Sequence, residues 1–148
     1  MTKDYGLAGL RLGYSIACRE ITGSLHRVLP PWSVNAVAQK AGILALAADD
    51  YLAQTKERIK KAKHYLTGEL ARLSFQPLPS DTHYFLVRVG DATSFHAALL
   101  KHGILVRDCA SFGLPEYIRI GTRTLPECQR LIATIEDQIN KGEINVPV

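Results

Sequence analysis

The sequence predicts an α/β fold in which helices pack on one face of a small sheet, and three observations support it. Apolar residues recur at helical spacing over 49–73 and again over 125–139, which indicates two amphipathic helices. Residues 83–89 alternate in the way a half-buried strand does. The second half of the chain reads helix, strand, helix, strand, strand, helix, which is typical of a layered unit.

Composition excludes several classes of protein. The 148 residues predict one domain, and 47% apolar with 22% charged residues excludes a disordered chain. No apolar run approaches the length of a membrane span, so no membrane partner is expected. Three scattered cysteines without a Cys-x-x-Cys pair favour the cytoplasm over a disulfide framework. The five histidines have no ligand spacing, so no metal site is expected.

The first half of the chain is expected to hold few regular elements. Residues 12–18 are predicted to form a short buried strand, and 19–29 are ambiguous, with a short helix as one interpretation. Pro30 and Pro31 interrupt whatever precedes them. Ser33 then fits the N-cap of an alanine-rich helix over 34–48, which is thin enough for close packing.

The second half is expected to begin with a long helix over 49–73, capped by Asp49 or Asp50. Pro77 and Pro79 indicate a loop after it. The elements expected beyond that loop are helices starting after Asp91 and Thr124 and strands over 83–89, 104–107 and 116–121. Thr124 and Glu127 have the spacing of a capping box, which marks the start of the last helix.

Candidate chemistry lies at the start of the chain, where Lys3 is followed eight residues later by Arg11. A lysine amine can form a Schiff base, and a guanidinium is a planar, permanently charged partner for phosphate. Gly6, Gly9 and Gly13 allow tight turns around the two side chains. Taken alone, a lysine and an arginine at this spacing are more often surface charges, but the glycine and leucine string around them favours a site.

From Lys3 onward this string resembles the cofactor-lysine signature of class I and II aminotransferases, which are fold-type I enzymes dependent on pyridoxal 5'-phosphate. The resemblance implies that Lys3 attaches the cofactor covalently and that Arg11 binds the cofactor phosphate. These enzymes usually carry a hydroxyl residue three positions before the lysine, which would fall before Met1. Thr2 is the nearest hydroxyl and is the remaining candidate for cofactor binding.

The resemblance continues to the end of the chain. Residues 31–36 (PWSVNA) resemble the segment that leads into the family's interdomain helix, and 103–108 (GILVRD) resemble a strand of its small domain. Residues 117–120 (YIRI) resemble the strand whose arginine binds the substrate carboxylate, which implies that role for Arg119. Alternation along this strand places Arg119 opposite Ile118 and Ile120, so that it points out of the core.

Two branches of the family compete. Histidinol-phosphate aminotransferases typically have Arg-x-x-x-Gly at this strand, whereas threonine-phosphate decarboxylases of cobalamin biosynthesis have Arg-x-x-x-Arg. Arg119 and Arg123 fit the second pattern, as does the segment 109–114 (CASFGL). A phosphorylated amino acid needs several cations, and Arg107, Arg119 and Arg123 are the candidates. The decarboxylase is therefore favoured, with the aminotransferase as the alternative and a surface role for Arg123 left open.

The resemblance also predicts the domain organisation: 1–30 as the last strand segment of a large cofactor-binding domain, 31–48 as the interdomain helix, and 49–148 as the C-terminal small domain. The family's ring-stacking aromatic and the aspartate that pairs with the pyridine nitrogen have no counterpart in this sequence. Without them the chain alone is expected to be inactive. The complete enzyme is expected to be a homodimer.

Two functions of other classes are alternatives to a pyridoxal-phosphate-dependent enzyme. Nucleic-acid binding would have to use the basic run at 56–64, which fits a solvated helix face better and has no interleaved aromatics, so no nucleic-acid partner is expected. A non-catalytic interaction domain would expose the apolar surface of the alanine-rich helix and would associate in solution.

Overall fold

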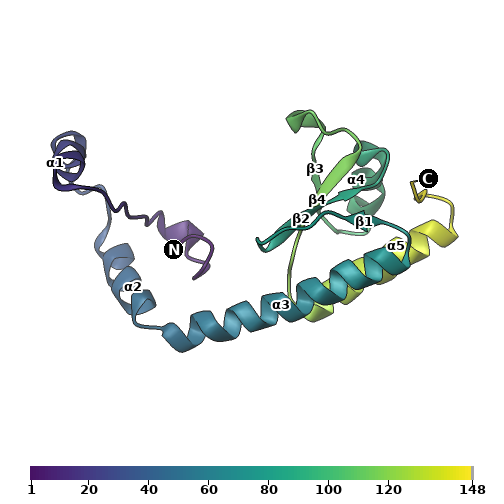
Figure 1. The fold of residues 1–148 in the computed structure, drawn as a ribbon, viewed down its shortest axis with the longest axis horizontal. Helices are drawn as coiled ribbons and strands as arrows, with labels where there is room; N and C mark the ends of the chain where they lie inside the picture. Colours follow the sequence, from purple (N-terminus) through teal and green to yellow (C-terminus); the bar gives the residue numbers. More distant parts are fainter. Residues whose placement is uncertain (148) are drawn as a thin grey trace. The chain divides into compact units, whose positions relative to one another are not determined.

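The computed structural model describes residues 1–147, and the chain divides into two compact units, Met1–Thr55 and Lys56–Val148. Unit 1 holds the short 3-10 helix η1 (Ala8–Leu10) and the helices α1 (Arg19–Val28) and α2 (Ala36–Leu46), which Figure 1 shows at the purple and blue end of the chain. The long helix α3 (Asp49–Arg72) begins in unit 1 and ends in unit 2. No helix of residues 1–147 has both the length and the apolar character needed to cross a membrane.

Unit 2 contains an antiparallel four-stranded sheet with the strand order β1-β2-β4-β3. Its elements are β1 (Gln76–Pro77), β2 (Tyr84–Arg88), α4 (Ala92–Leu100), β3 (Arg107–Asp108), η2 (Ala110–Phe112), β4 (Tyr117–Gly121) and α5 (Leu125–Asn140). The predicted class, helices packed on a small sheet, is therefore confirmed. The strand expected over 104–107 is wrong in its extent, because only Arg107 and Asp108 pair with β4.

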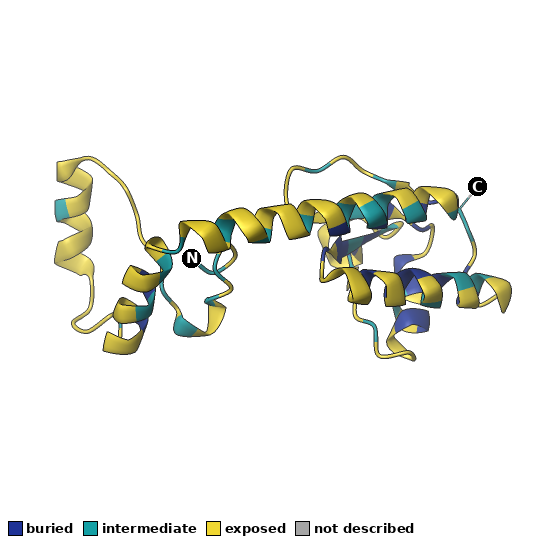
Figure 2. Ribbon diagram, turned by 90° about the horizontal axis from the view of Figure 1, so that it is seen from below, coloured by how far each residue is buried: buried dark blue, intermediate teal, exposed yellow. Residues whose placement is uncertain are grey.

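The core of unit 2 lies on one face of the sheet. Strands β2 and β4 alternate, so that Phe85, Val87, Ile118 and Ile120 are buried while the residues between them are more exposed. Buried side chains of α3, α4 and α5 cover this face, and Figure 2 shows the dark blue residues gathered there. The opposite face of the sheet is consequently open to polar residues, among them Arg119, as the alternation predicts.

Helix starts follow local capping chemistry. Asn35, not Ser33, caps α2, because its side-chain oxygen accepts a hydrogen bond from the Ala38 N–H at 2.8 Å. Asp91 caps α4 as predicted and accepts from the N–H groups of Thr93 and Ser94, both at 3.0 Å. The predicted start and end of the long helix, 49–73, agree with Asp49–Arg72 to within one residue.

The buried strand predicted over 12–18 is not present, and this expectation is wrong. The segment is irregular and exposed, with Tyr14 71% and Ile16 90% accessible. A strand needs a paired neighbour for its backbone N–H and C=O groups, and none of the strands described in residues 1–147 pairs with this segment. The ambiguous segment that follows it is helical, as α1.

Candidate active site

Lys3 and Arg11 lie on either side of η1 in unit 1. A tight turn follows Lys3, closed by a hydrogen bond of 3.3 Å from the Gly6 N–H to the Lys3 carbonyl. Gly6 has φ +65°, in the left-handed region that favours glycine. The helix η1 ends at Arg11, which has φ +51° and donates its own N–H to the Ala8 carbonyl at 3.3 Å. Thr2 is half-buried at the start of the same turn.

Two of these side chains are of the kinds that can bind the aldehyde and the phosphate of pyridoxal phosphate. Lys3 and Arg11 are both exposed, and within residues 1–147 neither has a carboxylate within ion-pair distance. The Arg11 guanidinium donates to the Ala8 carbonyl at 3.1 Å and keeps further N–H groups for an anion. A primary amine can bond the cofactor's aldehyde carbon and a guanidinium can bind its phosphate, so the residues fit the group.

Arg119 lies on the open face of the sheet in unit 2. It is half-buried on β4, and its guanidinium carbon lies 5.1 Å from the centre of the Tyr84 ring. This distance is within the range of a cation–π interaction, which holds the planar cation over the ring. Arg119 also lines a pocket of ≈ 380 Å³, together with Ser80, Leu86, Cys109, Phe112 and Leu114. The geometry presents a cation in a pocket whose other lining residues are mostly apolar.

Arg107 lies beside Arg119, because the two residues are direct partners in the register of β3 and β4. Its guanidinium carbon lies 5.0 Å from the centre of the Phe112 ring, and its Nη2 donates to the Ser111 hydroxyl at 3.0 Å. Like charges directly opposite on neighbouring strands repel each other. Within residues 1–147 no ion pair includes either arginine, so both guanidinium groups can accept an anionic partner.

Arg123 does not join this pair. Its guanidinium donates from Nε and Nη2 to Glu127 Oε1, at 3.1 and 2.9 Å. It also lines a different pocket, together with Ile104, Glu127 and Arg130. The structure therefore brings Arg107 and Arg119 together, whereas the carboxylate of Glu127 holds Arg123 at the start of α5.

Glu127 gives a pH-dependent prediction. Hydrogen bonds from the Thr124 hydroxyl, Arg123 and the Thr124 N–H lower the pKa of this carboxyl from 4.5 to about 2. Its folded-state pKa is depressed, so the stability it contributes is present above about pH 4.5 and is lost as the pH falls toward about 2. As the pH is lowered through this window, we expect the thermal unfolding midpoint of Glu127→Gln to decrease less than that of the unchanged chain. Equal falls in the two chains would contradict the assignment.

A cysteine forms part of the wall of the Arg119 pocket. Cys109 is buried, and burial raises the pKa of its thiol, an effect that the nearby Arg119 only partly offsets. The thiol donates weakly to the Arg107 carbonyl at 3.7 Å. Its place in the pocket is that of an apolar wall.

Tyr84, Phe112 and Ser80 are pocket residues that the sequence does not reveal. Tyr84 pairs with Gly121 in the register of β2 and β4, which places it diagonally across from Arg119. That register depends on the folded sheet, and no motif in the sequence encodes it. The only available signal was the alternation of β2, which puts Tyr84 on the face opposite Phe85.

The fold is that of the C-terminal portion of a fold-type I enzyme that depends on pyridoxal phosphate. The chain belongs to the aminotransferase class I and II family, whose model matches residues 1–135. This family depends on pyridoxal phosphate, so the predicted family and its cofactor are confirmed.

Curated relatives agree with this membership. Histidinol-phosphate aminotransferase 2 of Ralstonia nicotianae is 38% identical over 146 residues, which are 96% of this chain and 39% of that protein. Histidinol-phosphate aminotransferase of Halobacterium salinarum is 37% identical over 136 residues, covering 92% of this chain and 36% of that protein. The chain thus spans less than two fifths of the length of these relatives.

Solved structures match as well. Histidinol-phosphate aminotransferase from Clostridium acetobutylicum has a TM-score of 0.89 at 25% identity, covering 95% of this chain and 44% of that one. The same enzyme from Sinorhizobium meliloti, in complex with pyridoxal-5'-phosphate, has a TM-score of 0.81 at 29% identity, covering 94% and 39%. L-threonine-O-3-phosphate decarboxylase from Porphyromonas gingivalis has a TM-score of 0.78 at 26% identity, covering 94% and 45%.

The comparisons favour the histidinol-phosphate aminotransferase branch, which the sequence analysis gave as the alternative to the decarboxylase. The arginine at position 123 favours the decarboxylase, whereas the relatives in R. nicotianae and H. salinarum are named histidinol-phosphate aminotransferases. The ion pair with Glu127 gives Arg123 a structural role that does not depend on a substrate. The aminotransferase is therefore the better supported of the two.

Proposed function

We propose that this chain provides the cofactor lysine and the substrate-binding arginines of a pyridoxal-phosphate-dependent aminotransferase that acts on histidinol phosphate. The observation that carries the proposal is the match of nearly the whole chain to proteins of that name. The paired arginines 107 and 119 support it, because a phosphate monoester needs cations of this geometry. Three free cysteines support a cytoplasmic location, and a homodimer is the assembly we propose.

Each candidate residue has a distinct part in this proposal. Lys3 would hold the cofactor and would carry the proton between the substrate carbon and the cofactor. Arg11, with Thr2 beside the lysine, would hold the cofactor phosphate. Arg119 and Arg107 would bind the anionic end of the substrate, and the aromatic walls of the pocket would strengthen this binding by limiting water. The cofactor itself would supply an electron sink for the substrate carbon.

A second candidate is the decarboxylation of threonine phosphate. It is favoured by Arg123, which lies four residues after Arg119, and by the similarity to the P. gingivalis enzyme. This substrate carries both a carboxylate and a phosphate. In this candidate Arg123 would leave Glu127 to bind one of them, at the cost of the existing ion pair.

The cofactor assignment is tested by trapping pyridoxal phosphate on the chain. We expect borohydride reduction followed by mass spectrometry to find the label on Lys3, because Arg11 provides a nearby phosphate partner. Lys3→Arg should remove that label without increasing it elsewhere. Label spread over Lys56, Lys60, Lys61 and Lys63, or no label, would contradict the assignment.

A further inference from the structure

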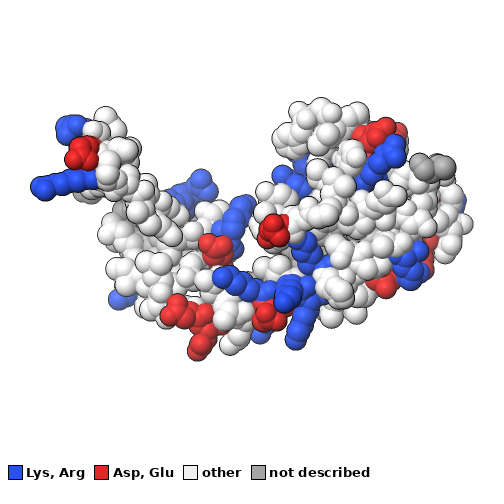
Figure 3. All heavy atoms as spheres, in the orientation of Figure 1, with Lys and Arg blue, Asp and Glu red and all other residues white. Residues whose placement is uncertain are grey.

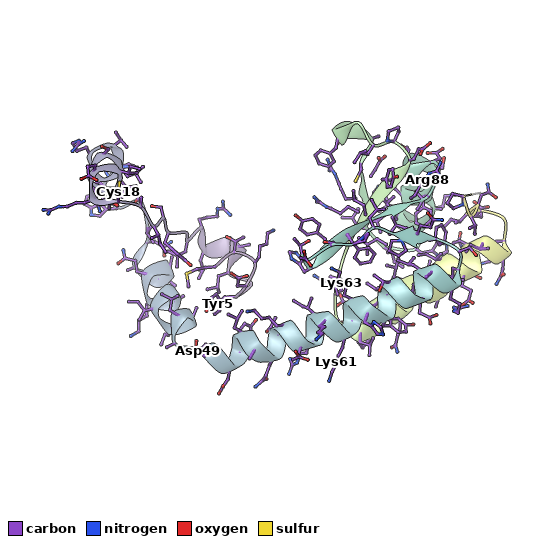
Figure 4. The ribbon with its side chains drawn as sticks, in the orientation of Figure 1. Tyr5, Cys18, Asp49, Lys61, Lys63 and Arg88 are labelled. Atoms are coloured by element: carbon purple, nitrogen blue, oxygen red, sulfur yellow. The ribbon has the colours of Figure 1, made fainter. Side chains whose placement is uncertain are left out.

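The loop of residues 79–83, between β1 and β2, forms one wall of the Arg119 pocket, to which it contributes Pro79 and Ser80. A lysine of α3 holds this loop. The Lys63 ammonium donates hydrogen bonds to the carbonyls of Ser80 and Thr82, the latter at 2.8 Å. Figure 4 shows Lys63 on the side of α3 that faces the sheet, with Lys61 on the other side.

A second set of hydrogen bonds connects the loop to the backbone of Tyr84. The hydroxyls of Ser80 and Thr82 both donate to the Tyr84 carbonyl, at 2.6 and 2.9 Å. The Tyr84 ring in turn lies against the Arg119 guanidinium. Lys63 is thereby connected to Arg119 through contacts that all lie within unit 2.

Lys63 differs from the other basic residues of its helix. Figure 3 shows lysine and arginine side chains along α3 with acidic ones among them. Lys63 is half-buried, and within residues 1–147 it has no carboxylate within ion-pair distance, so backbone carbonyls are its hydrogen-bond partners. A charged donor to a backbone carbonyl forms a stronger hydrogen bond than a neutral one. Lys61 is exposed, and no hydrogen bond of its side chain is present in this part of the chain.

We propose that Lys63 is a positioning residue that fixes the 79–83 loop and, through Tyr84, the orientation of Arg119 for binding the anionic group of the substrate. The proposal rests on the proposed function only for the identity of that ligand. Loss of the ammonium would release two carbonyls on the loop, and the loop would then sample other conformations. The anion site would keep its arginines but would lose their fixed orientation.

The test compares the full chain with Lys63→Met, Lys63→Arg and the matched control Lys61→Met. The amides of Thr82 and Tyr84, which donate to the hydroxyls of Ser80 and Thr82, report on the loop by hydrogen exchange. In Lys63→Met we expect their exchange to accelerate by about tenfold or more, since the lost bonds involve a charged donor. The NMR signal of the Arg119 Nε–H group should shift, and inorganic phosphate should bind about threefold or more weakly.

The controls decide the interpretation. Lys61→Met should leave all three measurements unchanged, and Lys63→Arg should restore them in large part, because a guanidinium can donate to both carbonyls. Unchanged exchange and an unchanged Arg119 signal in Lys63→Met would overturn the proposal, as would equal changes in Lys61→Met. If phosphate fails to bind the unchanged chain, the proposed function is contradicted, while the exchange rates and the Arg119 signal still decide the role of Lys63.

Discussion

Leu99→Ala is expected to lower the free energy of unfolding of unit 2 by about 2–5 kcal/mol. Leu99 is 0% exposed on α4 and belongs to the core on the covered face of the sheet. Alanine removes buried apolar surface and leaves a cavity that closely packed neighbours fill only in part. Since domains are stable by about 5–15 kcal/mol, the loss is a large share of the total.

The adjacent residue provides the matched control. Leu100 is 51% exposed on the same helix, so Leu100→Ala removes the same atoms from a surface position. We expect its effect to stay within about 0.5 kcal/mol, as for other surface substitutions. Both variants are compared by urea unfolding of the full chain. Equal losses for the two leucines would contradict the orientation of α4 described here.

Lys3→Ala is expected to cause the largest loss of activity, measured in a chimaera. The part of the R. nicotianae relative that this chain does not match would be joined to this chain, which supplies Lys3, Arg11 and Arg119. A positioned base that moves a proton contributes about 10²- to 10⁴-fold to a rate, so Lys3→Ala should lower turnover of histidinol phosphate by at least that factor.

The control for this substitution is Lys61→Ala, which removes an exposed lysine of α3 and should leave turnover unchanged. Absorbance of the bound cofactor shows whether each chimaera is loaded. A loaded Lys3→Ala chimaera that keeps its turnover within about twofold would remove Lys3 from the chemistry.

Much of unit 2 could be predicted because its elements have strong periodic signals. The apolar spacing of α3 and the capping residues Asp91 and Glu127 place three helices to within a few residues. The strand β1 could not be predicted, because Gln76 and Pro77 form a two-residue ladder that shows no alternation. Proline is also tolerated only at the edge of a sheet, where β1 lies.

Candidate site residues can be proposed from the sequence where a motif contains them, but not where the fold creates the contact. Lys3, Arg11 and Arg119 lie in strings that resemble a family, and alternation alone predicts the face of Arg119. The contact between Tyr84 and Arg119 depends on strand register, and the role of Lys63 depends on where a loop returns to α3. In the sequence Lys63 is one of several lysines on a basic helix face, which hides its difference from Lys61.

The central claim, that this chain serves an aminotransferase acting on histidinol phosphate, is tested most directly by the products of the chimaera. A second chimaera would carry the unmatched part of the P. gingivalis decarboxylase, so that neither partner alone decides the outcome. Each is given histidinol phosphate or O-phospho-L-threonine together with a 2-oxo acid as the amino acceptor, and amino transfer and CO2 release are measured. The account predicts amino transfer from histidinol phosphate without CO2 release, whereas CO2 release from O-phospho-L-threonine by both chimaeras without amino transfer would contradict it.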